Sequence, residues 1–142
     1  TIESQLEAIG DFPVTFHRAF DMCKNPDEAV RILADFGIEN ILTSGLYQNA
    51  IEGVGNLKRF TEIADGRINI TAGSGVNPGN ILKLAESNVN AFHFSAKRIY
   101  ESKMMFRNQL INMGGDKSVD EFATYEADIH LVKEAKALIE TL

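Results

Sequence analysis

Short apolar segments alternate along this chain with longer segments whose apolar residues recur at helical spacing. The short segments are rich in branched and aromatic residues, which predicts β-strands at 13–18, 39–43, 67–72 and 90–95. The longer segments predict helices at 1–9, 25–37, 51–64, 77–86 and 128–142. A helix that follows each strand returns the chain to the start of the next one, so the strands must be parallel. The pattern therefore predicts an α/β protein with helices on one side of the sheet.

The predicted helix starts carry specific local signals. Asn25-Pro26 and Asn77-Pro78 each place an asparagine at the capping position and a proline at the first helical position. Glu28 would close a capping box with Asn25, and Asp128 would cap the last helix. The segment 97–127 has weak periodicity, so we expect a long loop there. Loops of this length in a compact domain are usually functional or disordered.

The predicted strands recur roughly every 25 residues, which is the rhythm of consecutive βα units. Eight such units, in about 250 residues, close into a (β/α)8 barrel. The 142 residues hold four units and begin partway through a helix. We therefore expect residues 1–142 to form a single domain that is part of such a barrel.

The predicted strands have two chemically different faces. One face would carry apolar side chains and lie under the helices: Phe16, Leu42, Ile68, Ile70, Phe92 and Phe94. The other would carry Thr15, His17, Thr43, Asn69, Thr71, His93 and Ser95. Parallel strands are normally apolar on both faces, so this polar face indicates a lumen or cleft that holds water or ligand. The alternative is a polar core in which these groups bond to one another.

Candidate catalytic groups lie where the first and fourth predicted strands end. His17 and His93 end the first and fourth strands, where imidazoles can transfer protons near neutral pH or bind a metal ion. Either histidine can equally be structural. Arg18 and Asp21 complete the set of candidate catalytic residues, although an ion pair between them explains them more simply.

The turn Gly73-Ser74-Gly75 lies between a predicted strand and the helix that starts at Asn77. Backbone N–H groups in such a turn can bind an anion, and Ser95 after the next strand can add a hydroxyl. Arg107 in the long loop would supply positive charge above the turn. The alternative is a tight glycine turn with no ligand.

Composition limits the classes of partner. A net charge of −6 argues against binding to nucleic acid or to an anionic membrane. The single cysteine, Cys23, excludes an internal disulfide and fits a reducing compartment, so we expect a cytoplasmic protein. Cys23, Met22, Met104 and Met105 are soft groups that can bind monovalent copper, but the sequence has no Cys-x-x-Cys or His-x-x-x-His spacing.

Several motifs together resemble the CutC family, known as the copper homeostasis family. They are VTFHRAFD at 14–21, ILTSG at 41–45, AGSGV at 72–76, FHFSA at 92–96 and MFRN at 105–108. The resemblance covers nearly the whole chain in order. It implies a (β/α)8 barrel to which this chain contributes strands five to eight. It also implies copper as the bound ion, handled by binding, with His17, His93 and Cys23 as the candidate ligands in this chain.

Half a barrel leaves two open strand edges, so we expect completion by the missing half or association into a homo-oligomer. Two functions remain open. One is copper binding or trafficking. The other is an enzyme that acts on a small anionic or phosphorylated metabolite, bound at the glycine turn while His17 or His93 transfers a proton. Whether a reaction is catalysed stays open.

Overall fold

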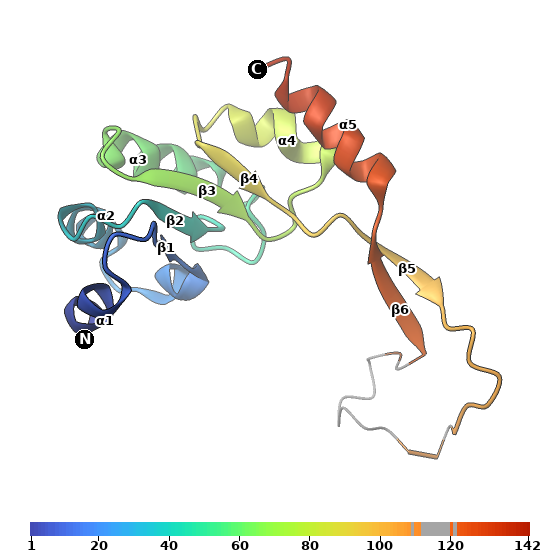
Figure 1. Ribbon diagram of the computed structural model, residues 1–142. Helices are drawn as coiled ribbons and strands as arrows, with labels where there is room; N and C mark the ends of the chain where they lie inside the picture. The colour runs from blue at the N-terminus through green and yellow to red at the C-terminus, as the bar shows by residue number, and fades with distance from the viewer. Residues whose placement is uncertain (109, 112–119, 121) are drawn as a thin grey trace.

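The computed structural model describes residues 1–108, 110, 111, 120 and 122–142. Its main sheet contains β1 (Thr15–Phe16), β2 (Asn40–Thr43), β3 (Asn69–Gly73) and β4 (Ala91–His93). These four strands are parallel and lie in the order β1-β2-β3-β4 (Figure 1). The predicted parallel strands, adjacent in chain order, are therefore confirmed, although each is shorter than its apolar segment.

The helices begin close to their predicted signals. They are α1 (Ile2–Ile9), the short 3-10 helix η1 (Arg18–Met22), α2 (Pro26–Asp35), α3 (Val54–Ala64), α4 (Pro78–Ala85) and α5 (Ile129–Ile139). Asn77 and Asp128 cap their helices by accepting from the N–H groups of Gly79 and His130. Asn25 does not cap α2, because its amide instead donates to the Glu28 carboxylate at 3.1 Å. The capping box predicted there is wrong.

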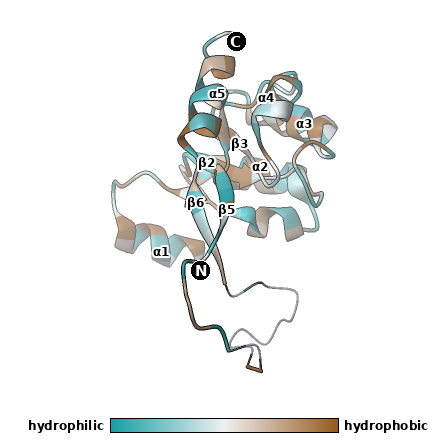
Figure 2. Ribbon diagram, turned by 90° about the vertical axis from the view of Figure 1, so that its right-hand side faces the viewer, coloured by the Kyte–Doolittle hydropathy of each residue, from teal (hydrophilic) through white to brown (hydrophobic). Residues whose placement is uncertain are grey.

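The core lies between one face of the sheet and the helices. Ile41 and Ile70 on that face are fully buried, together with Val30 of α2, Leu57 and Phe60 of α3, and Ile81 and Leu84 of α4. Burying one side chain of this size stabilises the fold by about 1.5–3 kcal/mol. Helix α5 lies beside α4 in both views and adds Ala135 to the core (Figures 1 and 2). The opposite face of the sheet remains half-buried or exposed, as Asn40, Asn69, Thr71 and His93 show.

The strand register corrects the predicted faces of β2. Ile41 is paired with Phe16 and Ile70, and Thr43 with Ala72, so both point toward the helices. Leu42 is paired with Thr71 and lies on the uncovered face. The prediction placed Leu42 inside and Thr43 outside. It failed because Ile41 and Leu42 are both apolar, and because hydrogen bonds satisfy the buried Thr43 hydroxyl.

A second sheet occupies part of the segment in which we expected a long loop. Strands β5 (Lys97–Glu101) and β6 (Ala123–Ala127) form an antiparallel pair that projects away from the main sheet (Figures 1 and 2). Nearly every residue of both strands is exposed, so no apolar alternation marks them in the sequence. The part of the expected loop at 109, 112–119 and 121 lies outside the described residues.

Candidate functional site

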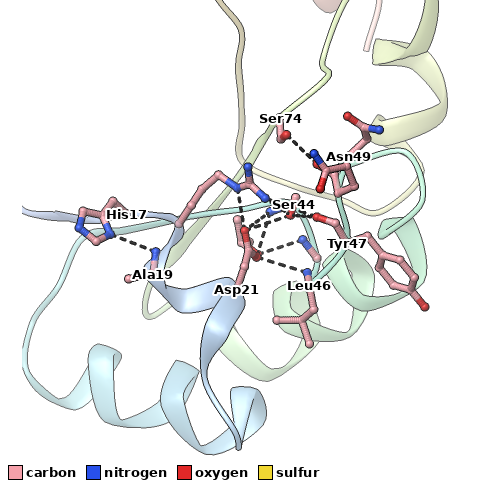
Figure 3. A network of polar contacts seen from close by, with 12 residues as sticks. His17, Ala19, Asp21, Ser44, Leu46, Tyr47, Asn49 and Ser74 are labelled. Carbon is pink, nitrogen blue, oxygen red and sulfur yellow. Dashed lines mark hydrogen bonds and ion pairs between the residues drawn. The ribbon is translucent and has the colours of Figure 1, made fainter. Parts of the chain in front are cut away.

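Asp21 is the centre of a hydrogen-bond network at the carboxyl ends of β1 and β2 (Figure 3). Its side chain is 7% exposed. The carboxylate accepts from the Thr43 hydroxyl, from the backbone N–H groups of Ser44 and Leu46 at 3.2 Å, and from Arg18 Nε at 2.8 Å. The Ser44 hydroxyl lies within hydrogen-bond distance of both Asp21 Oδ2, at 3.0 Å, and the Tyr47 carbonyl. This one side chain therefore ties η1 to the turn that follows β2.

The network also fixes the charge of Asp21. Burial by itself raises the pKa of this carboxyl, but hydrogen bonds from Thr43, Arg18 and Ser44 outweigh that effect and hold the pKa below its ordinary value. Asp21 is therefore ionised at neutral pH and accepts hydrogen bonds without exchanging protons. Its place is that of a structural anchor, which agrees with the ion pair expected between Arg18 and Asp21.

Arg18 is held on one edge and open on the other. Its Nε donates to Asp21, while Nη2 donates to the Ser44 hydroxyl at 2.9 Å and to the Tyr47 carbonyl at 3.4 Å. Among the described residues, Nη1 has no acceptor. The side chain is 42% exposed. The result is a guanidinium group fixed by buried partners, with two N–H groups directed elsewhere.

The glycine turn after β3 packs against the loop after β2. Ser74 donates its hydroxyl to the Gln48 carbonyl at 2.8 Å, and Ala50 donates its N–H to the Ser74 carbonyl at 2.9 Å. Ser74 and Gly75 both have positive φ, of 78° and 69°. Within the described part of the chain, the backbone N–H groups of Ser74, Gly75 and Val76 have no acceptor. These donors remain able to bind an anion, as the prediction requires.

The other two residues of the predicted anion site lie in different places. Ser95 lies two residues beyond the end of β4, whose last residue, His93, is paired with Gly73 at the start of the glycine turn. Arg107 instead belongs to the projecting hairpin. It is paired with Glu101 at 3.1 Å, donates to the Ser102 carbonyl, and lies over the Phe122 ring. The structure therefore does not bring Arg107 to the turn, because local partners hold its charge in the hairpin.

The two histidines lie at opposite edges of the sheet. His17 follows β1, and its Nδ1 accepts the N–H of Ala19 at 3.0 Å, which caps η1 and leaves Nε2 at the exposed end of the ring. His93 ends β4 on the uncovered face, and it is also exposed. Strands β2 and β3 lie between them. Both histidines lie at strand carboxyl ends, but no contact joins them.

Cys23 lies at the far end of η1 from His17 and packs partly against the core. A 3-10 helix rises about 2 Å per residue, which puts the two residues on the order of 12 Å apart. Burial raises the pKa of the Cys23 thiol, and the nearby Asp21 carboxylate adds to that effect. The thiolate that binds metals is therefore disfavoured. Within the described residues, no group of three or more His, Cys, Asp and Glu side chains could hold a metal ion.

Sequence reasoning missed Ser44 and Thr43 as the partners of Asp21. Both are fully buried, and both belong to the Thr43-Ser44-Gly45 segment that ends β2. Two hydroxyls directly after an apolar strand were the available signal, since small polar residues at that place bond to neighbouring turns. A hollow of about 580 Å³ lies at the other end of the sheet, where β2 and β3 begin. We do not place the site there, because ligands of parallel sheets bind at the carboxyl ends of the strands.

Comparison with known proteins decides the family. The model of the CutC family matches residues 1–98. A CutC family protein of Bacteroides fragilis is 41% identical over 138 residues, which are 96% of this chain and 54% of that protein. A CutC family protein of Photorhabdus laumondii is 43% identical over 136 residues, or 95% of this chain and 54% of that protein. The chain belongs to the CutC family.

A solved structure agrees with this assignment. The crystal structure of the copper homeostasis protein CutC from Streptococcus agalactiae is 30% identical to this CutC chain, with a TM-score of 0.61. The similarity covers 65% of this chain and 46% of that protein. The chain spans about half the length of the curated CutC relatives that it matches. No helix among the described residues of this CutC chain is long and apolar enough to cross a membrane.

Proposed function

We propose that this chain forms half of a (β/α)8 barrel of the CutC family and acts in cytoplasmic copper homeostasis. The observation that supports a barrel is the arrangement of the sheet and its helices. Four parallel strands lie in chain order, their helices cover one face, and the other face stays open and partly polar. Parallel sheets are covered on both faces in nearly all proteins. A closed barrel would turn this open face inward, as a lumen.

We propose further that copper binds at the mouth of that lumen. The exposed imidazoles of His17 and His93 are the ligands that this chain offers there, because both lie at strand carboxyl ends. They lie at opposite edges of the sheet, so the curvature of the closed barrel would have to bring them to one ion. Two imidazoles are suitable ligands for copper, and the other half of the barrel would add any further ones. Cys23 does not join this proposed site, since its thiol is partly buried and its pKa is raised.

Titration with monovalent copper under reducing conditions tests this site. We expect a defined stoichiometry, and about tenfold weaker binding after His17→Ala or His93→Ala, because each change removes one ligand. The matched control is Cys23→Ser, which should leave the affinity within twofold of the wild type. If the serine variant alone loses binding, copper is held by the thiol and the proposed site is wrong. If no variant changes the affinity, these residues do not bind copper.

A second candidate function is supported by groups at the mouth that can bind an anion. Arg18 is an exposed cation held by buried partners, and the Gly73–Gly75 turn, whose N–H donors are free among the described residues, contacts the same loop through Ser74 and the Gln48 carbonyl. These groups suit a small anionic metabolite, bound as a substrate while His17 or His93 transfers a proton. Turnover that His93→Ala abolishes, with substrate affinity unchanged, would separate this enzyme function from a copper carrier.

The open edges of the sheet support a proposal about partners. β1 and β4 each have a strand neighbour on one side within the described residues. Unpaired edges associate readily with other strands. We propose that the missing barrel half covers both edges, and that a homo-oligomer is the alternative when that half is absent.

A further inference from the structure

We infer that Arg18 anchors the phosphate group of a small metabolite, and that this phosphate bridges Arg18 and the Gly73–Gly75 turn. The inference rests on the proposal that the mouth of the sheet binds a small anionic ligand. In this proposal Arg18 takes the place in the anion site that the sequence had suggested for Arg107, which is held in the hairpin by Glu101 and Ser102. It also assigns Arg18 a binding role in addition to its ion pair with Asp21.

The first support is the way in which Arg18 is held. Asp21 is 7% exposed and Ser44 is fully buried, so two buried side chains position one exposed guanidinium. They contact Nε and Nη2, which leaves the two N–H groups of Nη1 for a ligand. An arginine fixed in this way loses little conformational entropy when it binds an anion, which is the advantage of a preorganised site.

The second support is that Arg18 and the glycine turn are joined through one short loop. Arg18 contacts the carbonyl of Tyr47, and Ser74 contacts the carbonyl of Gln48, the next residue. Figure 3 shows Ser74 on the same side of the network as Ser44 and Tyr47. Consecutive carbonyls are a few ångströms apart, so these contacts limit the separation of the Arg18 guanidinium and the Ser74 hydroxyl to about 10 Å or less. A phosphate with a hydrogen bond on each side spans roughly 7–8 Å, which lies within that limit.

The number of donors favours phosphate over a carboxylate. Nη1 of Arg18 offers two N–H groups, and Ser74, Gly75 and Val76 offer one backbone N–H each. A phosphate monoester presents three terminal oxygens and close to two negative charges at neutral pH, whereas a carboxylate presents two oxygens and one charge. At position 75 a Cβ would be strained at φ +69° and would meet the side chain of Asn49 at 2.7 Å, so glycine keeps the turn packed against the loop after β2.

Calorimetric titration with inorganic phosphate and with acetate tests the inference. We expect saturable phosphate binding that is at least tenfold tighter than acetate binding. Arg18→Met should weaken phosphate binding about tenfold or more, because it removes a charge-assisted contact. The matched control is Arg107→Met, which removes the same charge from the hairpin and should change the affinity less than twofold. Equal binding of acetate, or a larger effect of Arg107→Met, would overturn the assignment.

Because Arg18→Met can disturb the network around Asp21, a measurement on the unaltered chain is also needed. In ¹⁵N-resolved spectra, phosphate should shift the side-chain N–H of Arg18 together with the amides of Ser74, Gly75 and Val76. Shifts confined to other residues would overturn the inference. Copper titration of the same sample separates the two proposals. A chain that binds phosphate but no copper supports this inference and contradicts the copper site, and the reverse result does the opposite.

Discussion

At the scale of single residues, one carboxylate determines the geometry of the mouth. Asp21 accepts hydrogen bonds from η1, from the end of β2 and from the turn that follows, so three pieces of chain depend on it. A buried charge of this kind is tolerated because nearly all of its acceptor sites are occupied. Removing the charge would leave donors of Thr43, Ser44 and Arg18 without a full partner.

We therefore predict that Asp21→Asn lowers the free energy of unfolding by roughly 2–3 kcal/mol at pH 7, the cost of weakening a buried charged hydrogen-bond network. The matched control is Asp35→Asn. Asp35 forms an ion pair with Arg67, but its side chain is 70% exposed. Such pairs contribute less than about 1 kcal/mol. Urea denaturation of both variants measures the difference, and equal losses would show that the Asp21 network is not specially stabilising.

The lowered pKa of Asp21 also determines how the stability of the fold changes with pH. The pKa of Asp21 is lowered in the folded state. A lowered pKa contributes stability above the unfolded pKa of about 4, and that stability is lost as the pH falls through the folded pKa. The gap in stability between the wild type and Asp21→Asn should therefore narrow as the pH falls below about 4. A gap that stays constant down to acid unfolding would contradict this interpretation.

At the scale of elements, the close approach of two glycines sets the start of α3. Gly45 follows β2 and Gly53 precedes α3, and their backbones are in contact. A Cβ built on Gly53 would lie 2.1 Å from the Ser44 carbonyl oxygen. Gly55, two residues later inside α3, has open space around its Cβ position. Close backbone packing therefore requires glycine at position 53 but not at position 55.

This difference predicts opposite effects of one substitution. Gly53→Ala should lower the free energy of unfolding by about 1–3 kcal/mol, because the methyl group overlaps backbone that cannot move aside. Gly55→Ala should raise it by about 0.5–1 kcal/mol, because alanine is the better helix former. Thermal denaturation of the two variants side by side checks the signs. Destabilisation by both, or by neither, would mean that α3 begins in another way.

The elements also show what the sequence could and could not predict. Strands 1 to 4 were predictable because each is a short apolar core segment, and the helices after β1 and β3 carry Asn-Pro start signals at Asn25 and Asn77. β5 and β6 were not predictable, because nearly all of their side chains are exposed and no alternation of apolar residues marks them in the sequence. At the site, the Arg18–Asp21 pair was predictable from its spacing. The place of Arg107 depends on Glu101 and Phe122, and no local pattern reveals those contacts.

At the scale of the whole molecule, the sheet ends in two edges that closure of the proposed barrel would cover. The hydrogen bonds of β1 show which of its N–H groups face the open edge. The N–H of Asn40 in β2 bonds to the carbonyl of Val14, and Thr15 is the residue paired with Asn40. Successive residues of a strand direct their backbone groups to opposite sides, so Val14 faces β2 and the N–H of Thr15 faces away from β2. Proline at position 15 removes one outward donor and leaves the pairing with β2 intact.

We therefore predict that this chain forms a one-to-one complex with a fragment that supplies the part of the Bacteroides fragilis relative outside the matched 138 residues. Thr15→Pro should weaken that complex about tenfold or more, because barrel closure needs the outward donor of β1. The folded state of the chain alone should be unchanged by circular dichroism. The control is Ala123→Pro in β6, which lies in the projecting hairpin and not at the main sheet. Light scattering measures the complex. If Thr15→Pro binds the fragment as tightly as the wild type does, the edge of β1 takes no part in closure, and the four strands do not belong to a barrel.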